Sequence, residues 1–97
     1  METRRFLVTG GSRGIGSALV EQARNAGHQV VFTGRDQERI EKVASETGAV
    51  GIRADVAVSE DNARTVAECV ERMGGIDVLV NNAGYAYRAE IGELDLD

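Results

Sequence analysis

Short apolar runs alternate with longer segments of helical spacing along this chain. The apolar runs are rich in β-favouring residues and lie at 6–8, 30–32, 50–52 and 76–80. Between them, apolar residues recur every three or four positions, as they do on one face of a helix. Strands that alternate with helices build a parallel sheet with right-handed crossovers and helices on its faces. The sequence therefore predicts an α/β fold, a doubly wound parallel sheet with the order β-α-β-α-β-α-β.

Polar residues and glycines predict where each helix begins and ends. The first helix is expected to stop at Gly27, and the second to run from an Asp36 N-cap to Gly48. Ser59 is expected to cap the third helix, and Gly74-Gly75 to end it. The spacing predicts the following inward-facing residues: Ile15, Ala18, Leu19, Ala23 and Ala26 in the first helix, Ile40, Val43 and Ala44 in the second, and Ala63, Val66, Ala67, Val70 and Met73 in the third.

Composition and charge narrow the class of protein. The 97 residues are 42% hydrophobic and 28% charged, as in one small globular domain. No apolar run approaches the roughly 20 residues that span a bilayer, and the net charge of −5 disfavours nonspecific nucleic-acid binding. The single cysteine, Cys69, excludes an internal disulfide and is predicted to be partly buried, and one histidine without a Cys/His cluster predicts no metal site. We expect a cytoplasmic protein without membrane or nucleic-acid partners.

A glycine-rich stretch lies between the first predicted strand and the first helix, Thr9-Gly10-Gly11-Ser12-Arg13-Gly14-Ile15-Gly16. Glycines there let the backbone approach a pyrophosphate, and the helix N-terminus offers unpaired N–H groups and a positive dipole end. A turn that only packs the helix on the sheet is the alternative. A nucleoside-triphosphate P-loop is excluded, because it ends in Gly-Lys-Ser/Thr and Lys42 is the only lysine. The stretch predicts a dinucleotide-binding turn.

The end of the second predicted strand, Thr33-Gly34-Arg35, carries no carboxylate. A carboxylate there would hold ribose hydroxyls, as in methyltransferases and NAD enzymes, and would repel a 2′-phosphate. Arg35 instead offers a cation for that phosphate, and Arg13 can reach the same group. A solvated surface charge is the alternative for Arg35. The pattern predicts NADP, with NAD less favoured, and predicts that Gly34→Asp with Arg35→Ala reverses the preference.

Three stretches together resemble signatures of the short-chain dehydrogenase/reductase family. They are Thr9 to Gly16, then Ala54-Asp55-Val56 after the third strand, and Asn81-Asn82-Ala83-Gly84 after the fourth. They occur in the family's order and at its distances, and the resemblance covers essentially the whole chain. It implies a Rossmann-type sheet and hydride transfer between nicotinamide and a carbonyl or alcohol substrate. The likeness is to NADP-dependent, 3-oxoacyl reductase-like members.

The resemblance also implies a role for each matching residue. The resemblance places four residues beside the pyrophosphate and the adenosine ribose: Gly10, Ser12, Arg13 and Ile15. Gly14 and Gly16 would permit the close approach, and Arg35 would indicate NADP. Asp55 would accept a hydrogen bond from the adenine amino group, with Val56 beside the ring. The alternative for Asp55 is a turn or cap residue. The resemblance also places Asn82, Ala83 and Gly84 along the cofactor path, and the pair Asn81 and Asn82 would connect neighbouring strands.

The chain departs from the family beyond the fourth predicted strand. The family's catalytic Ser and Tyr-x-x-x-Lys are absent, because the last serine is Ser59 and no lysine follows Lys42. We therefore assign no catalytic residue, and interpret residues 1–97 as one truncated dinucleotide-binding domain with an irregular tail at about 85–97. The apolar edge of the fourth strand is expected to favour self-association. A nucleotide-binding module or an inert fragment without catalysis is the alternative.

Overall fold

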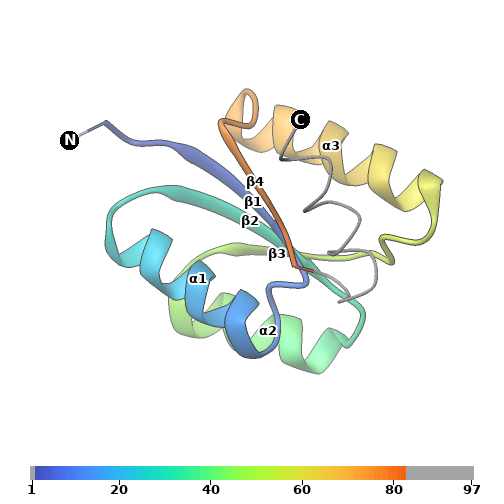
Figure 1. Cartoon of the computed structure of the whole chain (residues 1–97), viewed down its shortest axis with the longest axis horizontal. Helices are drawn as coiled ribbons and strands as arrows, with labels where there is room; N and C mark the ends of the chain where they lie inside the picture. The colour runs from blue at the N-terminus through green and yellow to red at the C-terminus, as the bar shows by residue number, and fades with distance from the viewer. Residues whose placement is uncertain (1, 83–97) are drawn as a thin grey trace, which may run out of the picture.

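The structure, a computed structural model, describes residues 2–82. Seven elements follow one another in this part of the chain (Figure 1): β1 (Arg5–Thr9), α1 (Gly14–Asn25), β2 (Gln29–Gly34), α2 (Gln37–Thr47), β3 (Val50–Arg53), α3 (Ser59–Met73) and β4 (Val78–Asn81). This order confirms the predicted alternation. The predicted tail at 85–97 and two predicted site residues, Ala83 and Gly84, lie outside the described residues.

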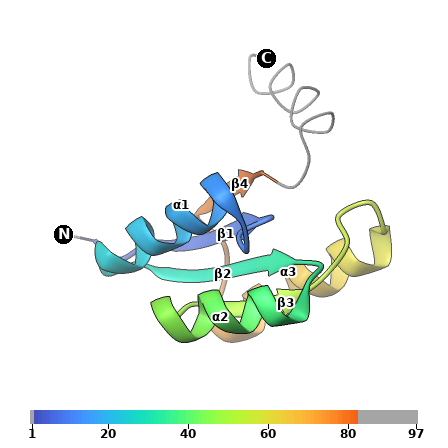
Figure 2. The same ribbon diagram turned by 90° about the horizontal axis from the view of Figure 1, so that it is seen from below.

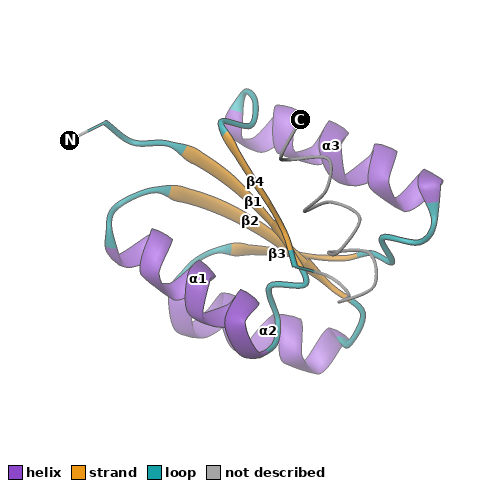
Figure 3. Cartoon of the chain, in the orientation of Figure 1, coloured by secondary structure: helices purple, strands orange, loops and turns teal. Residues whose placement is uncertain are grey.

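The four strands form one parallel sheet in the order β3-β2-β1-β4 (Figure 3). The chain adds β2 and β3 on one side of β1 and then crosses to the other side for β4. Right-handed crossovers accordingly put α1 and α2 on one face and α3 on the other (Figure 2). The carboxyl ends of β1 and β4 flank the point where the strand order reverses. In open α/β sheets, ligands bind in the crevice at such a switch point.

Each face of the sheet has its own buried cluster. Under α1 and α2 the cluster consists of Val8, Val20, Ala23, Val30, Phe32, Ile40, Val43 and Ala49. Under α3 it consists of Leu7, Val31, Ile52, Ala54 and Cys69. Successive side chains of a strand point to opposite faces, so the neighbours Leu7 and Val8 belong to different clusters. The strands are apolar on both sides because helices cover both faces.

The helix α1 presents a different face to the sheet from the predicted one. Its buried residues are Gly16, Val20 and Ala23. Of the predicted set, Ala23 is buried as expected, whereas Ile15 is 69% exposed and Ala18, Leu19 and Ala26 are exposed or half-buried. The cause is Gly16, where an added Cβ would overlap the carbonyl oxygen of Gly10. That backbone contact fixes the rotation of the helix and turns Val20 inward.

The prediction for α3 is wrong except at Met73, which packs against the buried cluster under this helix. Its buried residues are Thr65 and Cys69, whereas Val66 and Val70 are 47% and 52% exposed. Thr65 tolerates burial because its hydroxyl donates a hydrogen bond to the Asp61 carbonyl at 2.8 Å. Apolar spacing alone does not distinguish this face from the one beside it, since the two differ by a single residue position.

Most helix ends agree with the prediction, and one does not. The Asp36 carboxylate accepts from the backbone N–H groups of Glu38 and Arg39 at the start of α2. Gly48 and Gly74 end α2 and α3 in the left-handed conformation, with φ of 81° and 84°, and Gly27, with φ of 90°, follows α1. Ser59 is the first residue of α3 and not its cap; Val58 occupies that position without a side-chain hydrogen bond.

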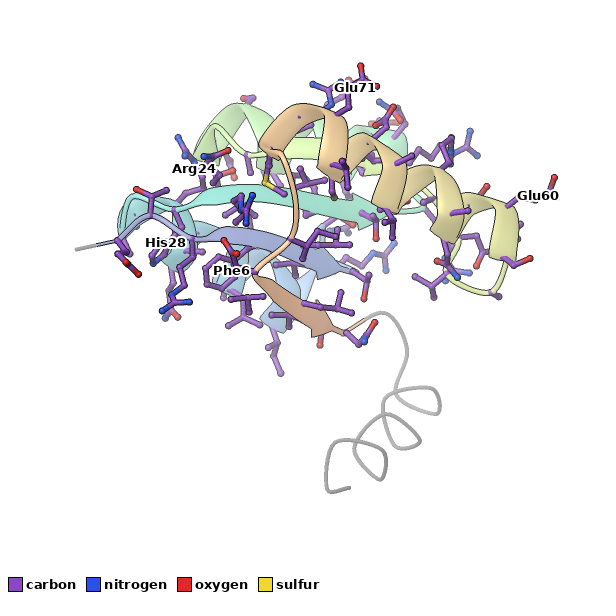
Figure 4. All side chains as sticks on the ribbon, turned by 90° about the horizontal axis from the view of Figure 1, so that it is seen from above. Phe6, Arg24, His28, Glu60 and Glu71 are labelled. Carbon is purple, nitrogen blue, oxygen red and sulfur yellow. The ribbon has the colours of Figure 1, made fainter. Side chains whose placement is uncertain are left out.

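Polar contacts hold together the amino ends of the strands, opposite the switch-point edge. The Asp77 carboxylate accepts two hydrogen bonds from the Arg5 guanidinium, at 2.8 and 2.9 Å, and one from the Arg5 backbone N–H. This pairing holds the pKa of Asp77 well below its usual range. Phe6 and His28 stack nearby with ring centroids 5.1 Å apart (Figure 4). The Arg5–Asp77 pair fixes where β4 starts beside β1, and so where β4 ends at the switch point.

Candidate functional site

The glycine turn is anchored to the end of β2. Gly11 N–H donates to the Thr33 carbonyl at 2.8 Å, and Gly10 N–H donates to the Thr33 hydroxyl at 3.3 Å. Gly10 and Gly14 have φ of 71° and 49°, in the left-handed region that favours glycine. The turn therefore crosses the carboxyl edge of the sheet in one fixed path, between β1 and α1.

The start of α1 is open to an anionic group. Its N-cap residue, Arg13, makes no side-chain capping bond, and the first turn of the helix contains no acidic residue. An added Cβ at Gly14 would meet no atom within 4 Å, so the space in front of the helix is free of described protein atoms at that point. Unpaired backbone N–H groups and the helix dipole favour a phosphate at such a terminus.

The end of β4 is tied to the glycine turn. Asn82 N–H donates to the Thr9 hydroxyl at 3.1 Å and to the Thr9 carbonyl at 3.2 Å. The Asn82 side-chain amide donates to the Gly10 carbonyl at 3.4 Å, and the Thr9 hydroxyl lies 3.4 Å from the Asn81 side-chain oxygen. The Asn pair thus joins β4 to β1 and its turn, as the resemblance implies.

Asp55 lies in a tight turn between β3 and α3. Its Oδ1 accepts from Ala57 N–H at 2.9 Å, and its own N–H donates to Asp61 Oδ2 at 2.8 Å. Asp61 Oδ1 in turn pairs with Arg64 at 3.4 Å. The turn role that stood as the alternative for Asp55 is therefore present. Its second carboxylate oxygen, Oδ2, accepts no hydrogen bond within residues 2–82, and remains open to a ligand.

Two clefts lie on the two sides of this edge. On the α3 side, a cleft of about 230 Å³ is lined mainly by strand ends and by α3: Leu7, Thr9, Thr33, Ala54, Val56, Asn62, Thr65, Val66, Leu79 and Asn81. On the other side, a cleft of about 340 Å³ lies between α1 and α2 and includes Ser12, Arg13, Arg39 and Lys42. The first is the more apolar in its lining residues, and the second is lined by three cationic side chains and also by Glu21 and Glu46.

Arg13 and Arg35 are exposed guanidinium groups at this edge. Within the described part of the chain, neither forms an ion pair. Gly34, the residue before Arg35, is buried, and the Arg35 carbonyl accepts from Arg53 Nε at 3.4 Å. The last residue of β2 therefore carries no carboxylate, Arg35 offers a cation, and the Asp36 carboxylate that follows is used as the cap of α2.

The structure brings most of the predicted site residues to one edge of the sheet. The glycine turn supplies Gly10, Ser12, Arg13, Gly14, Ile15 and Gly16, and the neighbouring strand ends supply Arg35, Asp55, Val56 and Asn82. Sequence reasoning missed Thr33 and Asp61, which anchor the turn and hold the Asp55 segment. The sequence does show a hydroxyl residue at a strand end, Thr33, and an acidic residue in the first turn of a helix, Asp61. It does not show which backbone groups these side chains bind.

The described residues were also compared with the requirements of a metal site, a membrane-spanning helix and a reactive thiol. Between Glu2 and Asn82, no three His, Cys, Asp or Glu side chains gather as metal ligands, and no helix is long and apolar enough to cross a membrane. Cys69, predicted to be partly buried, is fully buried, and burial raises the pKa of its thiol. Its environment is that of a packing residue.

The comparisons with known proteins agree with this geometry. The family model described as short chain dehydrogenase matches residues 4–97. L-fucose dehydrogenase of Rattus norvegicus is 43% identical over 88 residues, which are 90% of this chain and 33% of that protein. The 3-oxoacyl-[acyl-carrier-protein] reductase FabG of Aquifex aeolicus is 39% identical over 84 residues, 80% of this chain and 34% of that protein.

Solved structures give the same result. The crystal structure of an actinorhodin polyketide ketoreductase with NADPH has a TM-score of 0.81 and 34% identity, over 84% of this chain and 33% of that chain. This chain belongs to the short-chain dehydrogenase family, whose members use NAD(P) cofactors. It spans about a third of the length of the relatives that it matches.

Proposed function

We propose that this chain is the NADP-binding part of a short-chain oxidoreductase, which transfers hydride between nicotinamide and a carbonyl or alcohol substrate. The observation that carries the proposal is the end of β2, where a buried glycine, Gly34, precedes the exposed Arg35. Arg13 offers a second guanidinium. Arginine pairs with phosphate through two parallel hydrogen bonds, whereas a carboxylate at this strand end would repel the 2′-phosphate.

The start of α1 supports the pyrophosphate part of the proposal. Backbone N–H groups of its first turn would hold the phosphates, and the helix dipole would favour their charge. Gly10, Ser12, Arg13 and Ile15 would border the ligand, and Gly14 and Gly16 would permit its close approach. The close packing at Gly16 keeps these groups in place before the ligand binds.

Asp55 and Val56 would recognise the adenine ring. The amino group of adenine would donate to Asp55 Oδ2, and Val56 in the α3-side cleft would pack against the ring. Asn82, followed by Ala83 and Gly84, would line the path toward the nicotinamide. When bound, the cofactor supplies the hydride chemistry. The residues of this chain bind and orient it.

A nucleotide-binding module without chemistry is the second candidate. The 97 residues themselves contain no Tyr-x-x-x-Lys and no serine after Ser59. Both candidates need the nucleotide site and differ only in the reaction. We also propose a cytoplasmic location, since an unpaired thiol such as Cys69 suits a reducing compartment.

Calorimetric titration of the 97-residue chain tests the proposal. We expect NADP to bind more tightly than NAD, and 2′,5′-ADP more tightly than 5′-AMP, because each pair differs only by the 2′-phosphate. Equal affinities within both pairs contradict the NADP assignment but leave a dinucleotide site. The absence of binding by all four nucleotides contradicts the site itself.

A further inference from the structure

The end of β2 has no room for a side chain at Gly34. The φ of this residue is not positive, so its backbone conformation would accept any amino acid. An added Cβ, however, would lie 2.5 Å from Ser12 Oγ, 3.0 Å from Ser12 Cβ and 3.2 Å from Ile40 Cγ1. Contacts below 3.0 Å are essentially never seen for real Cβ atoms. Packing, and not backbone conformation, requires glycine here.

Ser12 cannot easily move away from Gly34. It is only 8% exposed, and the residue before it, Gly11, donates to the Thr33 carbonyl at 2.8 Å. An added Cβ at Gly11 would lie 2.6 Å from Phe32 Cβ. The turn is thus bonded to β2 and packed on it. Rotation of the serine hydroxyl would relieve the Oγ contact and leave the Cβ contact.

We propose that Ser12 is a specificity-determining residue, because its side chain fills the space that a carboxylate-bearing residue at position 34 would need. This inference rests on the proposed NADP function and deepens it. The choice of cofactor then depends on two positions that touch each other, one in the glycine turn and one at the end of β2. A turn with serine at position 12 excludes the NAD-type carboxylate sterically, before any question of charge arises.

The contact between Ser12 and position 34 changes which substitutions are expected to switch the cofactor. The sequence predicts that Gly34→Asp with Arg35→Ala reverses the preference. With Ser12 in place, the new Cβ has no space, and the strand end or the turn must shift. Ser12→Gly removes both serine atoms from the contact and leaves Ile40 Cγ1 at 3.2 Å, which a movement of a few tenths of an ångström relieves. The triple change Ser12→Gly, Gly34→Asp, Arg35→Ala is therefore the switch that the structure supports.

The first arm of the test measures stability without nucleotide. Gly34→Ala adds only the Cβ, and overpacking of this size lowers the melting temperature of a domain of this length by roughly 5–20 °C. In the Ser12→Gly background, the same Gly34→Ala change is expected to lower the melting temperature by only a small part of that amount. Ser12→Ala, which keeps the Cβ, is the matched control and is expected to restore less. Equal losses in the three backgrounds overturn the inference.

The second arm measures the ratio of NADP to NAD affinity. The triple variant is expected to favour NAD, whereas Gly34→Asp with Arg35→Ala in the presence of Ser12 is expected to gain little NAD affinity. Equal NAD gains in the two variants overturn the inference. The two arms test the Ser12 contact and the NADP function separately. The first arm can show that Ser12 and position 34 are coupled while the 2′-phosphate has no effect on wild-type binding. That result rejects the proposed NADP function and leaves the contact between Ser12 and position 34 established.

Discussion

Removal of the Arg35 guanidinium should weaken binding of the 2′-phosphorylated nucleotides alone. A charge-assisted hydrogen bond to phosphate contributes about 1.5–3 kcal/mol, which corresponds to roughly 10- to 150-fold in affinity. Arg35 is exposed, and solvent screening reduces such contributions. We therefore expect Arg35→Ala to weaken 2′,5′-ADP about tenfold and to leave 5′-AMP nearly unchanged. Salt should shrink the difference, because the Debye length falls from about 10 Å at 0.1 M to about 3 Å at 1 M.

The assay is calorimetric titration of the wild type and two variants with both nucleotides. Arg72→Ala is the matched control, because Arg72 is an exposed arginine in the last turn of α3, away from the switch-point edge, and its loss changes the net charge equally. An Arg35→Ala chain that binds 2′,5′-ADP as tightly as the wild type shows that Arg35 does not contact the 2′-phosphate. An Arg72→Ala chain that loses as much affinity shows that the effect comes from net charge.

Three further predictions concern stability, association and activity. Asp77→Asn should lower the melting temperature at pH 7 more than the exposed control Glu71→Gln. Because the folded-state pKa of Asp77 is depressed, the stability from its pairing with Arg5 is present above the unfolded-state pKa of about 3.9 and is lost as the pH falls below that value. A pH-independent difference in stability between Asp77→Asn and wild type is inconsistent with the pairing. Leu79 is 55% exposed on β4, and among the described residues this strand pairs with β1 alone. Leu79→Lys should therefore reduce concentration-dependent self-association in sedimentation, whereas Val58→Lys should not. A wild type that stays monomeric at all concentrations contradicts this expectation. The 97-residue chain should not oxidise NADPH with a panel of carbonyl compounds, because it lacks the Tyr-x-x-x-Lys acid–base pair, and turnover above that of Arg35→Ala would contradict the expectation.

The sequence predicted the features that depend on local signals. Glycine turns, an Asp cap and short apolar runs each act within a few residues, so the alternation of strands and helices, the glycine turn and the ends of α2 could be predicted from the sequence. The resemblance to the family added the Asp55 and Asn82 positions, because those motifs lie at fixed distances from the turn.

The features that the sequence did not predict depend on contacts between distant segments. The rotation of α1 is set by Gly16 against Gly10 and Asn82, and the face of α3 by a Thr65 hydroxyl that is satisfied within the helix. Apolar spacing detects neither. The contact between Ser12 and position 34 is likewise invisible in the sequence, because the turn and the strand end meet only in the folded sheet.

Arg13 and Arg35 are expected to hold the 2′-phosphate of the nucleotide, and phosphorus NMR of bound 2′,5′-ADP reports on this contact. A phosphate monoester loses its second proton near pH 6, and neighbouring guanidinium groups favour the dianion. We predict that, on binding, the 2′-phosphate resonance moves to the position of the dianion and that its titration midpoint shifts below that of the free nucleotide. Arg35→Ala should return the midpoint toward the free value. A 2′-phosphate that titrates in the complex as it does in free solution, while the 5′-phosphate resonance shifts, would show that these arginines do not hold it.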